Sequence, residues 1–151
     1  MTTRLYESTR SNVYDKLAAI SRPNGFKTDP CVLEGWLTLY AADLISGKNG
    51  KTFPAICVQY ANDKNGQQKG SVDNKAERQL SVIGAVHVDD CGGSINEALD
   101  DLLFDIKCAL CELDRKIDIS DVAYMLPETN EPYAMFEVKV TVTQTEKWQK
   151  G

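Results

Sequence analysis

The stretch QLSVIGAVHV, residues 79–88, decides the fold because apolar side chains recur at every second position along it. Leu80, Val82, Val86 and Val88 fall on one face of an extended strand, and the odd-numbered residues share the other. This period of two predicts a strand with one face in the core. Gly84 interrupts the apolar face, where a bulge or a close approach of another side chain would need a residue without a side chain.

A capped amphipathic helix is predicted directly after this strand, over residues 94–113. Ser94 and Glu97 form an S-x-x-E capping box, in which each side chain satisfies a free amide at the helix start. The apolar residues then recur at helical spacing for about five turns, or roughly 30 Å. They are Ile95, Leu99, Leu102, Leu103, Ile106, Ala109, Leu110 and Leu113. The acidic residues Asp100, Asp101, Asp105 and Glu112 fall largely off this stripe, which predicts a solvated face.

Weaker patterns complete the expected element order. Spaced apolar residues and a following Pro-Asn-Gly predict a first helix over residues 9–20, and apolar runs predict strands over 32–39, 53–60 and 134–142. Residues 117–126 fit a short helix or a strand, and residues 127–132 are typical of a loop. The sequence therefore predicts an α+β fold, in which a sheet of about four antiparallel strands is covered on one face by two helices.

One domain over residues 1–151 is expected, with a polar hairpin arm at about 61–78 and a polar C-terminal tail at about 144–151. Seventeen basic and 22 acidic residues give a net charge of -5, which argues against gripping nucleic acid through its phosphates. No long apolar run or signal-like start occurs. Neither a membrane span nor a secretory peptide is predicted, and the chain is expected to remain in the cytoplasm in which it is made.

The five cysteines are an odd number and lie mostly in apolar stretches, which favours buried free thiols. Cys108 and Cys111 form a C-x-x-C late in the predicted helix, where helix packing is favoured over redox or zinc chemistry. His87, Asp89 and Cys91 would project from one side of a strand and could hold a metal ion. They also occupy the end of a strand before Gly92-Gly93, where solvated turn residues are normal, and this second interpretation is favoured.

No catalytic constellation stands out. A Cys–His pair formed by Cys91 and His87 would span about 13 Å of extended strand, beyond hydrogen-bond reach. The sequence contains no G-x-S-x-G, no glycine-rich phosphate loop and no H-E-x-x-H. We therefore expect no enzyme activity, no cofactor and no metal site.

The polar insert KNGQQKGSVDNKAER, residues 64–78, separates two strand-like stretches and is longer than a hairpin turn needs. It contains Asn65-Gly66, a strong hairpin signal, and the residues around this pair could extend both strands. A disordered surface loop is the alternative to an arm that becomes ordered on meeting a neighbouring subunit or the end of a tube.

The tail contributes Trp148, which either contacts a partner or folds back on its own sheet edge; Trp36 is expected in the core. The candidate partner interface comprises Lys64, Asn65, Gln67, Gln68, Lys69, Asp73, Lys75, Arg78 and Trp148.

Nearly the whole chain resembles the tail terminator proteins of long-tailed bacteriophages, also called minor tail or tail completion proteins. The resemblance rests on a short N-terminal helix, the strand FPAICVQY, the long polar hairpin, the strand QLSVIGAVHV, the capped helix and a closing strand AMFEVKVTVTQ. It implies a virion subunit, assembled in the host cytoplasm, that forms a homo-hexameric ring at the head-proximal end of the tail. The ring would bind the tail tube protein, stop tube polymerisation and meet the head-completion or connector protein.

No catalytic residue is implied by the resemblance, and DNA would pass through the ring without specific binding. An acidic chain suits that passage, and antiparallel sheet edges suit subunit contacts. Two alternatives remain open. One is a cytosolic α+β binding module that recognises a peptide by its sheet edge; the other, less favoured, is a small metal-dependent enzyme using His87, Asp89 and Cys91.

Overall fold

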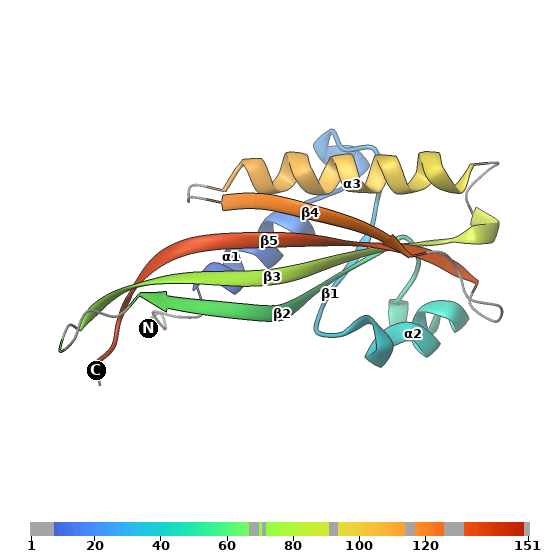
Figure 1. The fold of residues 1–151 in the computed structure, drawn as a ribbon. Coiled ribbons are helices and arrows are strands. Elements are labelled where there is room, and N and C mark those ends of the chain that lie inside the picture. Colours follow the sequence, from blue (N-terminus) through green and yellow to red (C-terminus); the bar gives the residue numbers. More distant parts are fainter. Residues whose placement is uncertain are drawn as a thin grey trace.

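In a computed structural model, the chain forms a five-stranded mixed sheet with helices on both faces (Figure 1). Residues 8–66, 70, 72–90, 94–113, 117–125 and 132–149 are described. The helices are α1 (Ser8–Ala18), α2 (Leu37–Ser46) and α3 (Ile95–Cys111), with short 3-10 turns η1 (Arg22–Asn24), η2 (Lys48–Gly50) and η3 (Val88–Asp90). The strands are β1 (Cys31–Glu34), β2 (Ala55–Gly66), β3 (Asp73–His87), β4 (Ile117–Met125) and β5 (Tyr133–Lys147).

The α+β class is confirmed, but the sheet differs from the four antiparallel strands expected. Its order is β1-β2-β3-β5-β4. The first pair, β1 and β2, is parallel, because the connection between them crosses over through α2; the remaining pairs are antiparallel. The fifth strand is β4, formed by the segment whose pattern fitted either a helix or a strand.

The alternation in β3 is confirmed, and its two faces belong to two different cores. Leu80 and Val82 pack with α1 and α3 on one side of the sheet, whereas Ile83 and Ala85 pack with α2 on the other. The expectation that both helices cover one face was therefore incomplete: α1 and α3 share a face, and a third helix covers part of the opposite face (Figure 1).

The first core lies between α3, α1 and the sheet. Leu17, Leu102 and Ile106 are fully buried in it. The predicted start of α3 is confirmed, since the hydroxyl oxygen of Ser94 accepts a hydrogen bond from the Glu97 amide at 3.2 Å. Burying each large apolar side chain in this core stabilises the fold by about 1.5–3 kcal/mol.

Another side chain approaches Gly84 closely, which is one of the two possibilities that its position in the strand suggests. Gly84 is paired directly with Phe136 of β5, and a Cβ added at Gly84 would overlap the Phe136 ring. The phenylalanine is fully buried. The glycine therefore leaves the space that this ring fills in the first core.

The predicted strand over residues 32–39 is wrong after Glu34. Gly35 has a φ of 110°, a conformation that L side chains rarely adopt, and it ends β1. Trp36 is the N-cap of α2, and the Tyr40 hydroxyl donates a hydrogen bond to the Glu34 carbonyl at 2.5 Å. The expectation that Trp36 belongs to the core is also wrong, because 50% of its surface is exposed.

Beyond the helices, β2, β3 and β5 continue as a three-stranded extension (Figure 1). We call it the arm: residues 61–66 of β2, 73–78 of β3 and 142–147 of β5. Its ladders run to the pairs Gly66↔Lys75 and Asp73↔Lys147. The polar insert thus extends both flanking strands, and the segment expected to be a polar tail from residue 144 belongs to β5 as far as Lys147.

Candidate assembly interface

Arg78 fixes the base of the arm. Its Nε lies 3.4 Å from Oδ1 of Asp63 on β2, and its guanidinium carbon lies 5.0 Å from the centre of the Tyr60 ring. A cation over an aromatic face adds about 0.5–1 kcal/mol at a partly exposed site. The ladder between β2 and β3 shifts register between Tyr60 and Asn62. The irregularity and this cluster together mark the point where the arm leaves the body of the sheet.

The predicted interface residues of the hairpin divide between the two faces of the arm. Directly paired residues point to the same face, so the pair Lys64↔Glu77 places Lys64 on the α2 side with Asp73 and Lys75. The pair Asn65↔Ala76 places Asn65 on the opposite side, with Arg78. Gln67, Gln68 and Lys69 lie outside the described residues.

Trp148 folds back on the arm. Its backbone amide donates to the Val72 carbonyl at 2.7 Å, and its indole Nε1 donates to Oε1 of Glu146 at 3.1 Å. The ring nevertheless keeps 39% of its surface exposed. Of the two alternatives, the structure has the folded-back one; contact with a partner stays a prediction.

The outer edge of β2 is open along the arm. β1 pairs with β2 only from Ala55 to Val58, and then turns away at Gly35. From Gln59 to Gly66, no strand of the described chain lies on this outer side. A hollow of about 220 Å3 lies where the two strands separate, with Trp36 and Tyr60 in its lining. Unpaired strand edges are templates for pairing with another chain.

The outer surface of α2 carries exposed apolar side chains. Trp36, Leu39 and Ile45 have 50%, 71% and 48% of their surfaces exposed. A helix that is apolar on its outer as well as its inner side is typical of an element covered by another surface. No expectation from the sequence included this helix, although Gly35 between two apolar runs was a usable signal.

The opposite edge of the sheet is β4, which pairs only with β5 among the described strands. Ile119 and Val122 pack against the first core. Asp118 and Asp121 are exposed, and Tyr124 keeps 53% of its surface exposed. The sheet therefore ends in two different edges, each with exposed aromatic and charged side chains.

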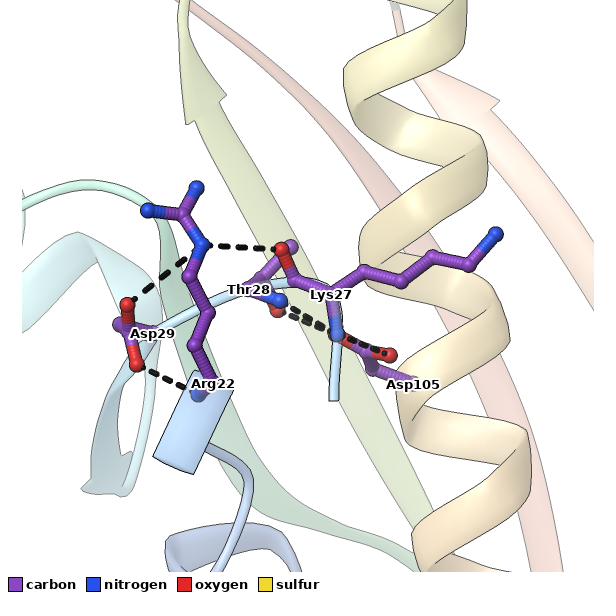
Figure 2. A network of polar contacts seen from close by, with 5 residues as sticks. All are labelled: Arg22, Lys27, Thr28, Asp29 and Asp105. Atoms are coloured by element: carbon purple, nitrogen blue, oxygen red, sulfur yellow. Dashed lines mark hydrogen bonds and ion pairs between the residues drawn. The ribbon is translucent and has the colours of Figure 1, made fainter. Parts of the chain in front are cut away.

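A buried carboxylate holds the loop that leads to β1. Asp105 of α3 is 1% exposed and accepts hydrogen bonds from the Lys27 amide at 3.1 Å, and from the amide and hydroxyl of Thr28 at 2.8 and 2.6 Å (Figure 2). Beside it, Arg22 pairs with Asp29 at 3.6 Å. The expectation that Asp105 belongs to a solvated face is wrong, because the side chain is buried. The groups that bind it come from a segment distant in sequence, which no local pattern reveals.

A pocket of about 560 Å3 opens next to this loop. Lys27, His87 and Glu97 are among its lining residues. The Lys27 ammonium lies 3.7 Å from Asp101 and 4.9 Å from the Phe104 ring centre, so its charge is already engaged. We assign no ligand to this pocket.

The three residues considered as metal ligands are only partly described. His87 ends β3, and its Nδ1 accepts a hydrogen bond from the Asp89 amide at 3.1 Å. Cys91 lies outside the described residues. Within the described ranges, no group of three His, Cys, Asp or Glu side chains could hold a metal ion. The absence of a metal site stays a prediction for the whole chain.

Cys31, Cys57, Cys108 and Cys111 are free thiols, and only Cys57 among them is fully buried. Burial, and secondarily the neighbouring Cys31, raises the pKa of Cys57 from 9.0 to about 12. Cys111 is exposed near the end of α3, and its thiol donates to the Cys108 carbonyl. The expected burial of the thiols therefore holds for Cys57 but not for Cys111.

No family model matches the chain, and no curated protein matches it. Among solved structures, the type 4 fimbrial biogenesis protein PilO from Pseudomonas aeruginosa is 8% identical with a TM-score of 0.31, covering 93% of this chain and 80% of that chain. The core region of PilO from the type IV pilus system of the same organism is 8% identical with a TM-score of 0.28, covering 62% of this chain and 82% of that one. Neither similarity is close enough to assign a role to this chain. No helix in the described part of the chain is long and apolar enough to cross a membrane.

Proposed function

We propose that this chain is a structural subunit of a bacteriophage tail, similar to tail terminators, that assembles into a ring on the end of the tail tube. In this role it stops tube polymerisation and offers a surface to the head-completion or connector protein. The proposed ring is a homo-hexamer, built in the host cytoplasm and retained in the virion. The resemblance over nearly the whole sequence supports this role.

The observation that carries the proposal is the arm. The β2 edge of this three-stranded extension is open and exposed from Tyr60 to Gly66. A sheet that projects beyond its helices gains stability when another chain covers its edge. Contacts of this kind between different surfaces of identical subunits close into a ring when the rotation between neighbours is right.

The open edge also favours a second candidate, a binding module that takes up an extended peptide as an additional strand of its sheet. Main-chain hydrogen bonds along β2 would provide affinity, and the hollow beside Trp36 and Tyr60 would accept a side chain. This module would be a monomer that binds one peptide. The two candidates therefore differ in whether the chain associates with itself.

Native mass spectrometry and negative-stain electron microscopy over a range of protein concentrations test the first candidate. We expect a ring, or an oligomer whose population rises with concentration, and we expect purified tail-tube protein to bind it. A strict monomer at several hundred micromolar that ignores tail-tube protein would rule against the ring. In that event, a peptide-display screen on the monomer tests the second candidate.

A further inference from the structure

The two edges of the sheet are suited to each other. β2 has an open segment from Gln59 to Gly66, and β4 is a last strand of similar length, from Ile117 to Met125. The chain passes through the sheet as β2, β3, β5 and β4 with each neighbouring pair antiparallel, so β4 runs opposite to β2. In copies related by rotation about an axis along the strands, β4 of one copy would meet β2 of the next in antiparallel orientation.

We propose that the β4 edge of one copy pairs with the open β2 edge of the next, so that the sheet continues from subunit to subunit. This inference rests on the proposed function and names the two surfaces that would make the ring. The contact is heterologous, because each copy uses β2 towards one neighbour and β4 towards the other.

Charge supplies the first argument for a second copy as the occupant. Lys64 on β2 and Asp118 on β4 are both exposed, and neither makes an ion pair with any part of the chain that the structure describes. Edge charges normally keep sheets apart when like charges meet. Opposite charges on the two edges do the reverse, since they favour β2 with β4 over either edge with itself.

Side-chain direction supplies the second argument. The pair Lys64↔Glu77 places Lys64 on the α2 side of the sheet, and the pair Asp118↔Thr141 places Asp118 on that same side. If these two residues stand opposite each other in the antiparallel contact, counting along both strands places Tyr60 opposite Val122. The pairs Tyr60↔Leu80 and Val122↔Val138 put both on the α3 side. A single register therefore pairs opposite charges on the α2 side of the sheet and apolar side chains on the α3 side.

The test uses two single variants and their mixture. Lys64→Glu places like charges at the contact, and Asp118→Lys does the same from the other edge. Each variant alone is expected to need at least a tenfold higher concentration to assemble than the unchanged chain, measured by sedimentation velocity. An equimolar mixture is expected to assemble again. In the mixture, the edge carrying Lys64→Glu faces the edge carrying Asp118→Lys, while the two unsubstituted edges face each other in the next contact.

Lys48→Glu is the matched control, since Lys48 is an exposed lysine on η2, which belongs to neither edge strand. It is expected to assemble like the unchanged chain. We expect every variant to fold, because the substituted side chains are exposed. Circular dichroism and the melting temperature verify this. If either edge variant assembles at the same concentration as the unchanged chain, the proposed β2–β4 contact is wrong, but the proposed ring is not contradicted.

A mixture that stays dissociated, when both single variants have lost assembly, also overturns the contact, because it means that the two residues do not face each other. If the unchanged chain is itself a monomer at several hundred micromolar and does not bind tail-tube protein, the proposed function fails together with this inference. Sedimentation velocity of the unchanged chain, of each edge variant and of their mixture distinguishes these outcomes from one another.

Discussion

At the scale of single residues, Asp105 is the only charged side chain that is buried among the residues the structure describes. It is a charged side chain with almost no exposed surface, and it is compensated by the hydrogen bonds it accepts from Lys27 and Thr28. Buried carboxylates are tolerated only with such compensation. Asp105 thereby joins α3 to the loop that sets the start of β1.

Replacing Asp105 with asparagine is expected to destabilise the protein by about 2–3 kcal/mol. An amide nitrogen cannot accept the bonds that one carboxylate oxygen accepts from Thr28, and hydrogen bonds to charged groups are worth about 1.5–3 kcal/mol each. Chemical denaturation measures the loss. Asp101→Asn is the control and should cost under about 1 kcal/mol, because its ion pair with Lys27 is solvent-exposed. Equal losses in the two variants would contradict the role given to Asp105.

The sequence could not place Asp105, although it could place the residues around it. The helical stripe of α3 and its Ser94 cap follow from local spacing alone, and both were predicted. The partners of Asp105 lie 77 and 78 residues away in the chain. A local pattern carries no information about that contact, so it predicts a surface position for an acidic residue beside an apolar stripe. Gly84 differs, because its place within an apolar alternation already suggested a close approach.

At the scale of elements, the predicted parts are those whose pattern is uninterrupted. β3 and α3 were predicted from ten or more consecutive informative positions. The error at α2 came from carrying an apolar run across Gly35, where a positive φ ends β1 and a helix begins. β4 was ambiguous because its alternation is short, and its pairing with β5 resolves it. The partner strand, rather than the segment itself, selects the strand conformation.

The arm is the element whose removal is most informative. Replacing residues 64–77 with Asn-Gly leaves Asp63↔Arg78 as the last pair of the hairpin. Both helix-packed cores remain, so we expect cooperative unfolding with a melting temperature lowered by a few degrees. Assembly, measured by sedimentation, is expected to be lost. Rings of the shortened chain, or its continued binding to tube ends, would contradict a role for the arm.

A chain that ends at Lys147 is the companion variant. It removes Trp148 and keeps every strand pair of the arm. If assembly depends on the strand edges, this truncated chain still assembles, and the shortened hairpin does not. Loss of assembly in both would show that the folded-back indole also contributes to the contact.

At the scale of the whole molecule, the sheet order depends on contacts that no segment encodes alone. The parallel pair of β1 and β2 needs the α2 crossover, and the strand order places β5 between β3 and β4. A segment pattern can indicate a strand but not its neighbours, which is why four antiparallel strands were expected. Cys57, paired with Leu33 across the parallel strands, is a buried reporter of this arrangement.

Labelling of Cys57 should therefore report unfolding of the entire sheet. At pH 8 a thiol reagent is expected to modify exposed Cys111 rapidly, and Cys57 only at the rate set by global opening. The raised pKa of Cys57 also predicts the direction in which the free energy of unfolding changes at alkaline pH. Below pH 9 the Cys57 thiol is neutral in both states; from pH 9 towards pH 12 it ionises only in the unfolded chain, which favours unfolding.

The resulting loss approaches about 1.4 kcal/mol per pH unit above pH 9, because one proton is bound by the folded state and not by the unfolded one. Denaturation midpoints of the unchanged chain and of Cys57→Ala, followed from pH 8 to pH 11, measure it as a difference in slope. Comparing slopes removes the constant cost of the small cavity in the variant and the titration of other groups that both proteins share. Equal slopes would mean that the pKa of Cys57 is the same in the folded and the unfolded chain. Labelling of Cys57 as fast as Cys111 would mean that the β1–β2 pair opens independently of the rest of the sheet.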